Sequence, residues 1–381
     1  MIIISNAHTK EDLKQLQSLP LEAKIRLTKE RIRAWYEAWW RYEIEDTKTG
    51  SIRYVAIDNR DYSAQPKMKD TEVIKSIRKG AVYVSFSGGK DSTVLKHIID
   101  SMYDDVPSVF VNTGLEYPEI QKFVKEIKNG KYECFNSNIE ILWPEMRFDE
   151  VIKRYGYPVI SKEISETIYY ARRSKENGSN STRLKRLNGE WTDGNGNKSK
   201  FNCEKWKFMI DAPFEVHASC CNIMKEKPSK QYAKKNGLKQ IVGTMACESR
   251  RREITWMKIG CNSFNDANAK SAPMSFWTEQ DVLHYIKKFD VPYCSVYGEI
   301  EENINKNDEL ITTGCNRTGC IFCMFGCHLE KEPNRFQTLK KTHPRQYEYC
   351  INGGEMVDGK WQPNKEGLGL KMVLDYIGVK Y

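Results

Sequence analysis

The sequence predicts an α/β protein built on a doubly wound, mainly parallel sheet. Two observations lead to this prediction. Short apolar runs of the length of buried strands alternate with helix-like stretches through the middle of the chain. A glycine-rich hexapeptide, SGGKDS at residues 87–92, follows the first of these runs and precedes a helix-like stretch. Ligands of such folds bind at the carboxyl ends of the strands, which is where this hexapeptide lies.

The elements follow in order from the hydrophobic pattern. Residues 21–42 have helical spacing and predict a helix that packs in the core or against a second subunit of a homo-oligomer. A polar connector is expected next at 46–69, and a short helix at 71–78. Buried strands are predicted at 82–86, 108–111, 139–142 and 240–242, with helices at 93–103, 118–128, 162–172 and after Thr278, whose capping partner is Asp281.

The length of 381 residues allows one large α/β core with an appended subdomain. We predict a helical N-terminal extension at 1–70, an α/β domain at 71–300 and a Cys-rich, helical C-terminal subdomain at 301–381. A polar insertion at about 172–202 is rich in Ser, Asn, Gly, Lys and Arg, and predicts a mobile loop. Its basic charge suits a nucleic acid or a partner protein, although the composition favours a solvated loop over either.

The charge balance is basic, with 60 Lys and Arg against 51 Asp and Glu, a net charge of +9. This excess suits anionic partners such as nucleotides or nucleic acid, between which charge alone does not choose. The sequence has no signal-like segment and no apolar run long enough to cross a bilayer, so we expect a cytoplasmic protein without a membrane partner. The 12 cysteines are then expected to bind metal rather than to form disulfides.

The hexapeptide has the composition of a pyrophosphate-binding loop. Gly88 and Gly89 reach backbone angles closed to other residues, so main-chain N–H groups can approach an anion, and Lys90 adds a positive charge. A helix that opens at Ser92 would add its N-terminal dipole. The spacing differs from the GxxxxGK[ST] loop and predicts another way of holding phosphate. The simpler alternative is a Gly-Gly turn with an exposed lysine.

A second group of residues is rich in sulfur. Cys220 and Cys221 are adjacent, and four further cysteines follow about one hundred residues later. Thiolates select zinc or an iron–sulfur cluster, and the sequence does not choose between S4 zinc and [4Fe–4S]. Six thiols exceed the four that either centre needs. The four later cysteines are Cys315, Cys320, Cys323 and Cys327, whereas Cys134, Cys247, Cys261 and Cys294 are expected to be small buried apolar residues.

Six motifs together resemble the phosphoadenosine phosphosulfate reductase family, part of the N-type ATP pyrophosphatase or adenine nucleotide alpha hydrolase superfamily. They extend over roughly residues 81–325 and are VSFSGGKDSTVL, FVNTGLEYPE, GYPVISKEIS, the Cys220–Cys221 pair, GTMACESRRR and WTEQDV. The resemblance implies an adenine nucleotide alpha hydrolase-like fold. It also implies that the hexapeptide binds the phosphates or sulfate of an adenine nucleotide through Ser87, Gly88, Gly89, Lys90, Asp91 and Ser92.

The resemblance assigns further residues. The main chain at Ser85 and Phe86, with Thr113 and Gly114, would border adenine and ribose. Arg250 and Arg251 would face the anionic end. In the cluster-bearing reductases a Cys pair and a distant C-x2-C hold a [4Fe–4S] centre, which corresponds here to Cys220, Cys221, Cys320 and Cys323.

The chain also departs from this family. Those reductases attack sulfur with a cysteine in a Glu-Cys-Gly-Leu-His tail, whereas this chain ends in GLGLKMVLDYIGVKY. Cys350 is the nearest substitute, and it is expected to pack structurally. Cys315 and Cys327 have no counterpart in the reductase pattern and resemble the compact cysteine sets of sulfur-transfer relatives, so they are alternative ligands.

Without a nucleophilic tail, we expect ATP pyrophosphatase or adenylyl-transfer chemistry, with Mg²⁺ and Lys90, Asp91 and Ser92 at the reacting phosphates. Asp91 would hold the metal or cap the helix. Two alternatives remain open. One is a reductase of phosphoadenosine or adenosine phosphosulfate (PAPS or APS) that uses Cys350 or a thiol of the cluster region. The other is a nucleotide-sensing or nucleic-acid-binding subunit without turnover.

Overall fold

The computed structural model describes residues 8–61, 65–265, 269–304 and 309–381. The chain gathers into two compact units, and each unit is made of several separate segments. The first unit takes the chain up to residue 112 together with 117–143 and 228–318, and the second takes 113–116, 144–227 and 319–381. These groupings cut across the predicted ranges 1–70, 71–300 and 301–381.

A six-stranded sheet in the first unit confirms the predicted α/β fold. Its strand order is β6-β5-β4-β8-β10-β9, and all neighbours are parallel except β9 and β10. The chain therefore winds outward from β4 in both directions, which defines a doubly wound sheet with its switch point between β4 and β8. The strands are β4 (Val82–Ser85), β5 (Ser108–Val111), β6 (Ile139–Leu142), β8 (Lys239–Val242), β9 (Asn262–Ser263) and β10 (Lys270–Ser271).

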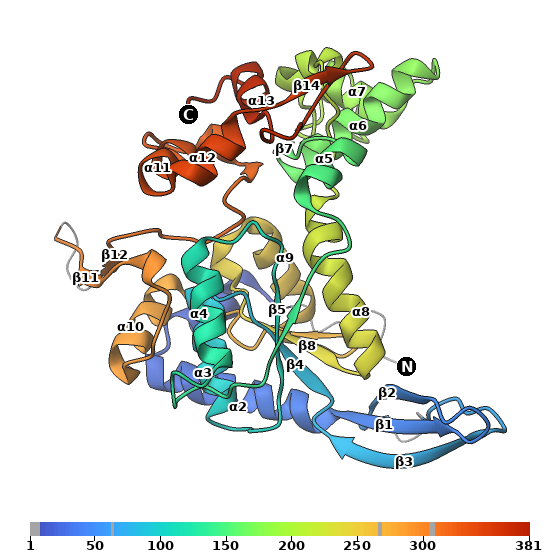
Figure 1. Ribbon diagram of the computed structural model, residues 1–381, viewed down its shortest axis with the longest axis vertical. Helices are drawn as coiled ribbons and strands as arrows, with labels where there is room; N and C mark the ends of the chain where they lie inside the picture. Colours follow the sequence, from blue (N-terminus) through green and yellow to red (C-terminus); the bar gives the residue numbers. More distant parts are fainter. Residues whose placement is uncertain (1–7, 62–64, 266–268, 305–308) are drawn as a thin grey trace. The chain divides into compact units, whose positions relative to one another are not determined.

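Helices cover both faces of this sheet. Figure 1 shows α3 and α4 together on one side and α8 on the other. Val82 and Val84 are fully buried because both faces are covered, which is why these strands are apolar throughout. The helices of this unit are α1 (Lys10–Gln17), α2 (Leu21–Ala38), α3 (Lys90–Asp100), α4 (Pro118–Lys128), α8 (Lys227–Asn236), α9 (Arg250–Ile259) and α10 (Glu279–Phe289).

The N-terminal region differs from its prediction. The helix predicted over 21–42 ends at Ala38, where two tryptophans begin a strand. The connector 46–69 contains a strand, and 71–78 is a strand rather than a helix. These strands form an antiparallel sheet of order β2-β1-β3, which Figure 1 shows extending away from the six-stranded sheet. They are β1 (Trp39–Asp46), β2 (Ile52–Asp58) and β3 (Glu72–Lys79).

Short elements complete the first unit near the end of its last segment. The capping box predicted at Thr278 and Asp281 is present at the start of α10. A 3-10 turn, η5 (Ser295–Tyr297), follows α10 and packs on α4. The remaining elements are η3 (Ala246–Glu248), β11 (Ile300–Glu302) and β12 (Leu310–Thr312).

The second unit is mainly helical. Its predicted insertion at 172–202 is folded in part, because it carries α7 and an isolated bridge between Thr192 and Lys198. The helices are α5 (Phe148–Tyr155), α6 (Lys162–Glu176), α7 (Thr182–Asn188), η1 (Glu204–Asp211), the π-helix η2 (Asn222–Glu226), η6 (Cys327–Leu329), α11 (Arg335–Thr342), α12 (Pro344–Ile351) and α13 (Leu370–Tyr376). Two-stranded sheets pair β7 (Val159–Ile160) with β13 (Met324–Phe325) and β14 (Glu355–Val357) with β15 (Lys360–Gln362).

The sequence predicts that the chain has no segment that crosses a membrane. Among the described residues, no helix combines the length and the apolarity needed to span a bilayer.

Candidate functional site

The SGGKDS loop connects β4 to α3 at the switch point of the sheet. Gly88 has a φ of +71°, and a Cβ there would lie 2.8 Å from Ile120 Cγ2, so both backbone angle and space require glycine. Helix α3 begins at Lys90, two residues earlier than predicted, with Gly89 as its N-cap. The loop therefore points the N-terminus of a helix at the carboxyl edge of the sheet, an arrangement that favours anions.

The two serines of the loop hold its shape. The Ser87 N–H donates to Ser92 Oγ at 3.2 Å, and the two hydroxyl oxygens lie 2.9 Å apart. Ser92 Oγ also donates to the carbonyl of Gly89 at 3.0 Å. These bonds close the loop on itself, so Ser87 and Ser92 fix the backbone conformation in addition to any contact with a ligand.

Lys90 is buried and already has partners. Its ammonium donates to the carbonyl of Asn316 at 2.6 Å and pairs with Glu279 Oε1 at 2.9 Å. Its backbone N–H donates to Tyr297 Oη at 3.1 Å, and that hydroxyl lies 2.7 Å from Thr318 Oγ1. The alternative of an exposed lysine on a Gly-Gly turn is wrong, since Lys90 is 4% exposed.

Asp91 has an unusual environment. Its Oδ1 is buried and has no hydrogen-bond partner within the described part of the chain. Burial raises the pKa of the Asp91 carboxyl, although Lys90 and Arg317 act in the opposite direction. Asp91 does not cap α3, because the cap is Gly89 and receives no side-chain bond. A buried carboxylate oxygen without a partner fits a bound cation, so this residue is suited to hold Mg²⁺.

Two guanidinium groups lie beside the loop. Arg252 and Arg317 both pair with Glu248, and both interact electrostatically with Asp91. Burial and the neighbouring Arg317 lower the pKa of the Arg252 guanidinium. The sequence analysis chose Arg250 and Arg251, which form the exposed first turn of α9 together with Arg252, and it chose neither Arg252 nor Arg317. The third arginine of the ESRRR motif was a usable signal for Arg252, whereas nothing local marks Arg317.

The other predicted nucleotide contacts divide between the two units. Ser85 ends β4 and Phe86 follows it as a buried residue of the first unit. Thr113 and Gly114 are grouped with the second unit. There Thr113 is buried, and both its N–H and its hydroxyl donate to Glu116.

The predicted quartet of thiols comes together in the second unit. Cys220 and Cys221 lie at the start of the π-helical turn η2, with their sulfur atoms 4.0 Å apart. The Cys220 thiol interacts electrostatically with Cys320 and Cys323 as well. Burial raises the pKa of Cys320 to about 11. The hydrogen bond from Cys220 lowers the pKa of Cys221, aided by Lys162 and Lys225.

Lys225 and Lys162 supply positive charge to the thiols. Burial alone would lower the pKa of Lys225, but the Cys320 thiolate and the Glu116 carboxylate raise it overall. Lys162 lies two residues after Ile160, a β-branched residue with a φ of +63°. Such a residue in the left-handed region stores strain of roughly 1–3 kcal/mol, and strained residues concentrate at functional sites.

Of the two alternative ligands, Cys327 belongs to the second unit and interacts electrostatically with Cys323. Cys315 belongs to the first unit, where its thiol bonds to Tyr117 and burial raises its pKa. Cys327 is buried, and its thiol donates to the carbonyl of Met324 at 3.0 Å. Within the described residues, no group of three or more His, Cys, Asp or Glu side chains forms a site for a single metal ion. A [4Fe–4S] cube takes one thiolate per iron, so its four ligands need not converge on one point.

The remaining cysteines follow their predictions only in part. Cys261 and Cys294 are buried as expected, and Cys350 is fully buried with its pKa raised by burial. The expectation is wrong for Cys134 and Cys247, which are exposed. The Cys247 thiol donates to the carbonyl of Trp277 at 3.4 Å and interacts electrostatically with Asp91 and Arg317.

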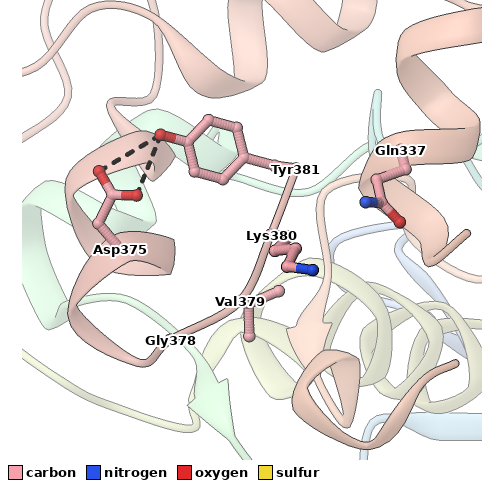
Figure 2. Close-up of a pocket in the computed structure, with 6 residues that line it drawn as sticks. All are labelled: Gln337, Asp375, Gly378, Val379, Lys380 and Tyr381. Atoms are coloured by element: carbon pink, nitrogen blue, oxygen red, sulfur yellow. Dashed lines mark hydrogen bonds between the residues drawn. The ribbon is translucent and has the colours of Figure 1, made fainter. Parts of the chain in front are cut away.

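A cavity of about 540 Å³ lies near the C-terminus of the second unit. Figure 2 shows its lining, where Tyr381 Oη bonds to Asp375, Lys380 belongs to the same C-terminal segment and Gln337 comes from α11. It contains none of the predicted site residues, and its lysine is paired with Glu332.

Comparison with known proteins gives a consistent result. A family model described as the phosphoadenosine phosphosulfate reductase domain matches residues 81–176 and 163–325. Two uncharacterized proteins of Methanocaldococcus jannaschii, MJ0973 and MJ0066, are 23% and 24% identical to the chain over 302 residues. Those matches cover 77% and 78% of this chain and 54% and 45% of the relatives, so the chain spans about half the length of these relatives.

Two named reductases also match. A phosphoadenosine 5'-phosphosulfate reductase of Buchnera aphidicola is 34% identical over 71 residues, 18% of this chain and 29% of that protein. The solved structure of phosphoadenylyl-sulfate reductase from Candida auris is 14% identical, with a TM-score of 0.32, and covers 58% of this chain and 80% of its own.

Proposed function

Because the chain belongs to the phosphoadenosine phosphosulfate reductase domain family, we propose that it is an adenine-nucleotide enzyme of the ATP pyrophosphatase type. It cleaves ATP between the α- and β-phosphates, transfers AMP to an acceptor oxygen and releases pyrophosphate. A sulfur nucleophile then displaces AMP from the adenylated acceptor. The observation that carries this proposal is the glycine-bent loop that places the buried, unpartnered Asp91 oxygen among Lys90, Arg252 and Arg317.

Each part of the loop has a role in this reaction. Main-chain N–H groups at the start of α3 receive phosphate oxygens, and Lys90 exchanges Glu279 for phosphate. Asp91 would hold Mg²⁺, and that ion would supply neutralisation of the charge on the leaving pyrophosphate. Such a reaction requires positioning and charge neutralisation rather than a covalent intermediate.

The four thiols of the second unit are proposed to hold a [4Fe–4S] cluster. A set of four cysteines has the chemistry that iron–sulfur clusters require, and a cluster supplies electrons or sulfur when bound. Lys225 and Lys162 offset the negative charge of the thiolates. A zinc ion is the alternative occupant of the same cysteines, and binding it would require these side chains to move closer together around one ion.

Reduction of a sulfonucleotide is the second candidate. The family match favours it, and so does the exposed Cys247 thiol, which interacts electrostatically with Asp91. In that reaction a thiolate attacks the sulfate sulfur, the nucleoside phosphate leaves, and an external dithiol releases sulfite as it is oxidised to a disulfide. Cys350 does not fit the role of nucleophile, because it is fully buried.

Pyrophosphate release from ATP by the Lys90→Ala variant tests the proposal. We expect release to fall to background, because the loop loses its cation, while circular dichroism keeps the wild-type signature. Full turnover by the variant would rule out this loop as the catalytic site. Sulfite release from PAPS or APS by the wild-type chain, sensitive to Cys247→Ser, would favour the reductase instead.

Partners of the insertion belong to the same proposal. Exposed Phe201 lies beside the cationic side chains of Arg186 and Lys200. Aromatic rings with cations suit a nucleic acid strand, and stimulation of pyrophosphate release by DNA or RNA would identify that partner. A homo-oligomer also remains a proposal.

A further inference from the structure

A short segment before the Cys-rich motif lies against the phosphate loop. We name residues 313–318 the strap. Its backbone is held to η5 by the bond from the Gly314 N–H to the carbonyl of Tyr297, at 2.8 Å, and by the bond from Cys315 to Val296, at 3.0 Å. A Cβ at Gly89 would lie 3.1 Å from both Thr318 Oγ1 and Tyr297 Oη. The strap is therefore part of the loop's immediate surroundings.

The strap presents one cation to the solvent at this place. The Arg317 side chain is 58% exposed, and its only ion-pair partner among the described residues is Glu248. Arg252 shares the same carboxylate and is 43% exposed. Lys90, by contrast, has a side chain that is only 4% exposed. An anion that approaches the loop from solvent therefore meets the two guanidinium groups before it meets the ammonium group.

The pairing with Glu248 is easy to exchange. The Arg317 side chain is 58% exposed and can turn to a phosphate, while Glu248, which is 12% exposed, keeps its pair with Arg252. The planar guanidinium fork matches phosphate oxygens and binds them through two parallel hydrogen bonds. Glu248 also accepts the Met245 N–H at 2.8 Å, so it stays in place when a guanidinium leaves it.

We propose that Arg317 is a phosphate-binding residue, which leaves Glu248 to bind the pyrophosphate part of the nucleotide. This inference rests on the proposed function and extends it to a residue outside the SGGKDS loop. The residues on both sides of Arg317 contact the loop, since the carbonyl of Asn316 accepts the Lys90 ammonium at 2.6 Å and Thr318 lies against Gly89, so its guanidinium is proposed to bind the β- and γ-phosphates that leave together. The adenosine end of the nucleotide is not part of its contact.

Calorimetric titration of the full chain with inorganic pyrophosphate, ATP with Mg²⁺, and AMP tests this role. We expect Arg317→Ala to weaken pyrophosphate and ATP binding roughly 10- to 100-fold, because a charge-assisted contact is lost. AMP lacks the β- and γ-phosphates that Arg317 is proposed to bind, so its affinity should change less than about twofold. Glu248→Gln keeps an acceptor for Met245 but frees both arginines, so it should tighten pyrophosphate binding about two- to fivefold.

Arg60→Ala is the matched control, since Arg60 is another half-exposed arginine paired with a single carboxylate, that of Asp58. It removes the same charge and should leave all three affinities unchanged. If Arg317→Ala binds pyrophosphate as Arg60→Ala does while the wild type binds ATP, the inference is overturned and the proposed function stands. If the wild type binds neither ATP nor pyrophosphate, both the inference and the proposed function are wrong.

Discussion

At the residue scale, Asp91 shows how a site is maintained at the expense of stability. Its carboxyl is buried beside three cations, yet one oxygen lacks a partner within the described residues. Burial raises the pKa of this carboxyl, so ionising it in the isolated chain costs free energy. A cation bound there would remove that penalty, which is how stability and ligand binding become linked.

The Asp91→Asn variant should make this linkage visible. The folded pKa of Asp91 lies above its ordinary value of 3.8, so its contribution to stability is present below pH 3.8 and is lost as the pH rises through the folded pKa. Asparagine has the same shape without the charge, so we expect the free energy of unfolding without ligand to rise by about 1–2 kcal/mol at pH 7.

Chemical denaturation of both proteins between pH 4 and pH 8 measures the difference. The difference between their free energies of unfolding should decrease toward low pH. Mg²⁺ with ATP should stabilise the wild type but not the variant. A difference that stays constant over this range would contradict the assigned cause.

At the element scale, α10 depends on one residue for two purposes. Asp281 completes the capping box with Thr278 and also receives the buried ammonium of Lys24 at 2.7 and 2.8 Å. The two residues cap the same helix end, but only Asp281 neutralises a buried charge. Lys24 has a side chain that is 3% exposed, so no solvent replaces a lost carboxylate.

Thermal and urea unfolding of two variants separates these contributions. Thr278→Ala should cost about 1 kcal/mol, the usual value of a lost cap. Asp281→Ala should cost about 3–5 kcal/mol, because it leaves the Lys24 charge buried and unpaired. Equal costs in the two variants would show that the buried ion pair contributes nothing beyond capping.

The same scale shows what the sequence could and could not predict. The strands of the parallel sheet were predictable because burial on both faces makes them continuous apolar runs, and β5 and β6 lie at the expected residues. Strand β3 was not predictable, because its apolar residues Val73, Ile74 and Ile77 have helical spacing. A bulge opposite Glu43 and Ile44 adds one residue to this strand, so its apolar side chains are not two apart.

The residues of the site also include some that the sequence could predict and some that it could not. Residues of the loop were recognisable because glycine angles and a helix start are local properties. Glu279, Tyr297 and Arg317 meet the loop only through the tertiary fold, and their sequence neighbourhoods give no sign of it. Cys247 was misjudged for the same reason, since exposure depends on what packs around a residue.

At the scale of the whole molecule, the proposed cluster can be tested apart from the nucleotide loop. Cys320→Ser with Cys323→Ser removes two thiols of the second unit and changes no residue in the sequence of the first. We expect anaerobically purified variant protein to lose bound iron, or zinc, and the visible absorbance of a cluster. Pyrophosphate affinity should stay at the wild-type value, because the loop is intact.

Two measurements decide this prediction. Metal and sulfide analysis of the double variant should fall below one tenth of the wild-type content, on the order expected when half the ligands are lost. Metal at full stoichiometry would show that other residues are the ligands. Cys134→Ser is the matched control, because that thiol is exposed and lies outside the quartet.

The way in which the chain is divided between its two units has a consequence for inheritance. The polypeptide changes unit after residues 112, 116, 143, 227 and 318, so neither half is encoded by one uninterrupted stretch of gene. Recombination at a single breakpoint can therefore not exchange the thiol-bearing half for another while it preserves the phosphate loop. Descendants of this protein would therefore change either chemistry by substitutions within these interleaved segments rather than acquire it as a ready-made module.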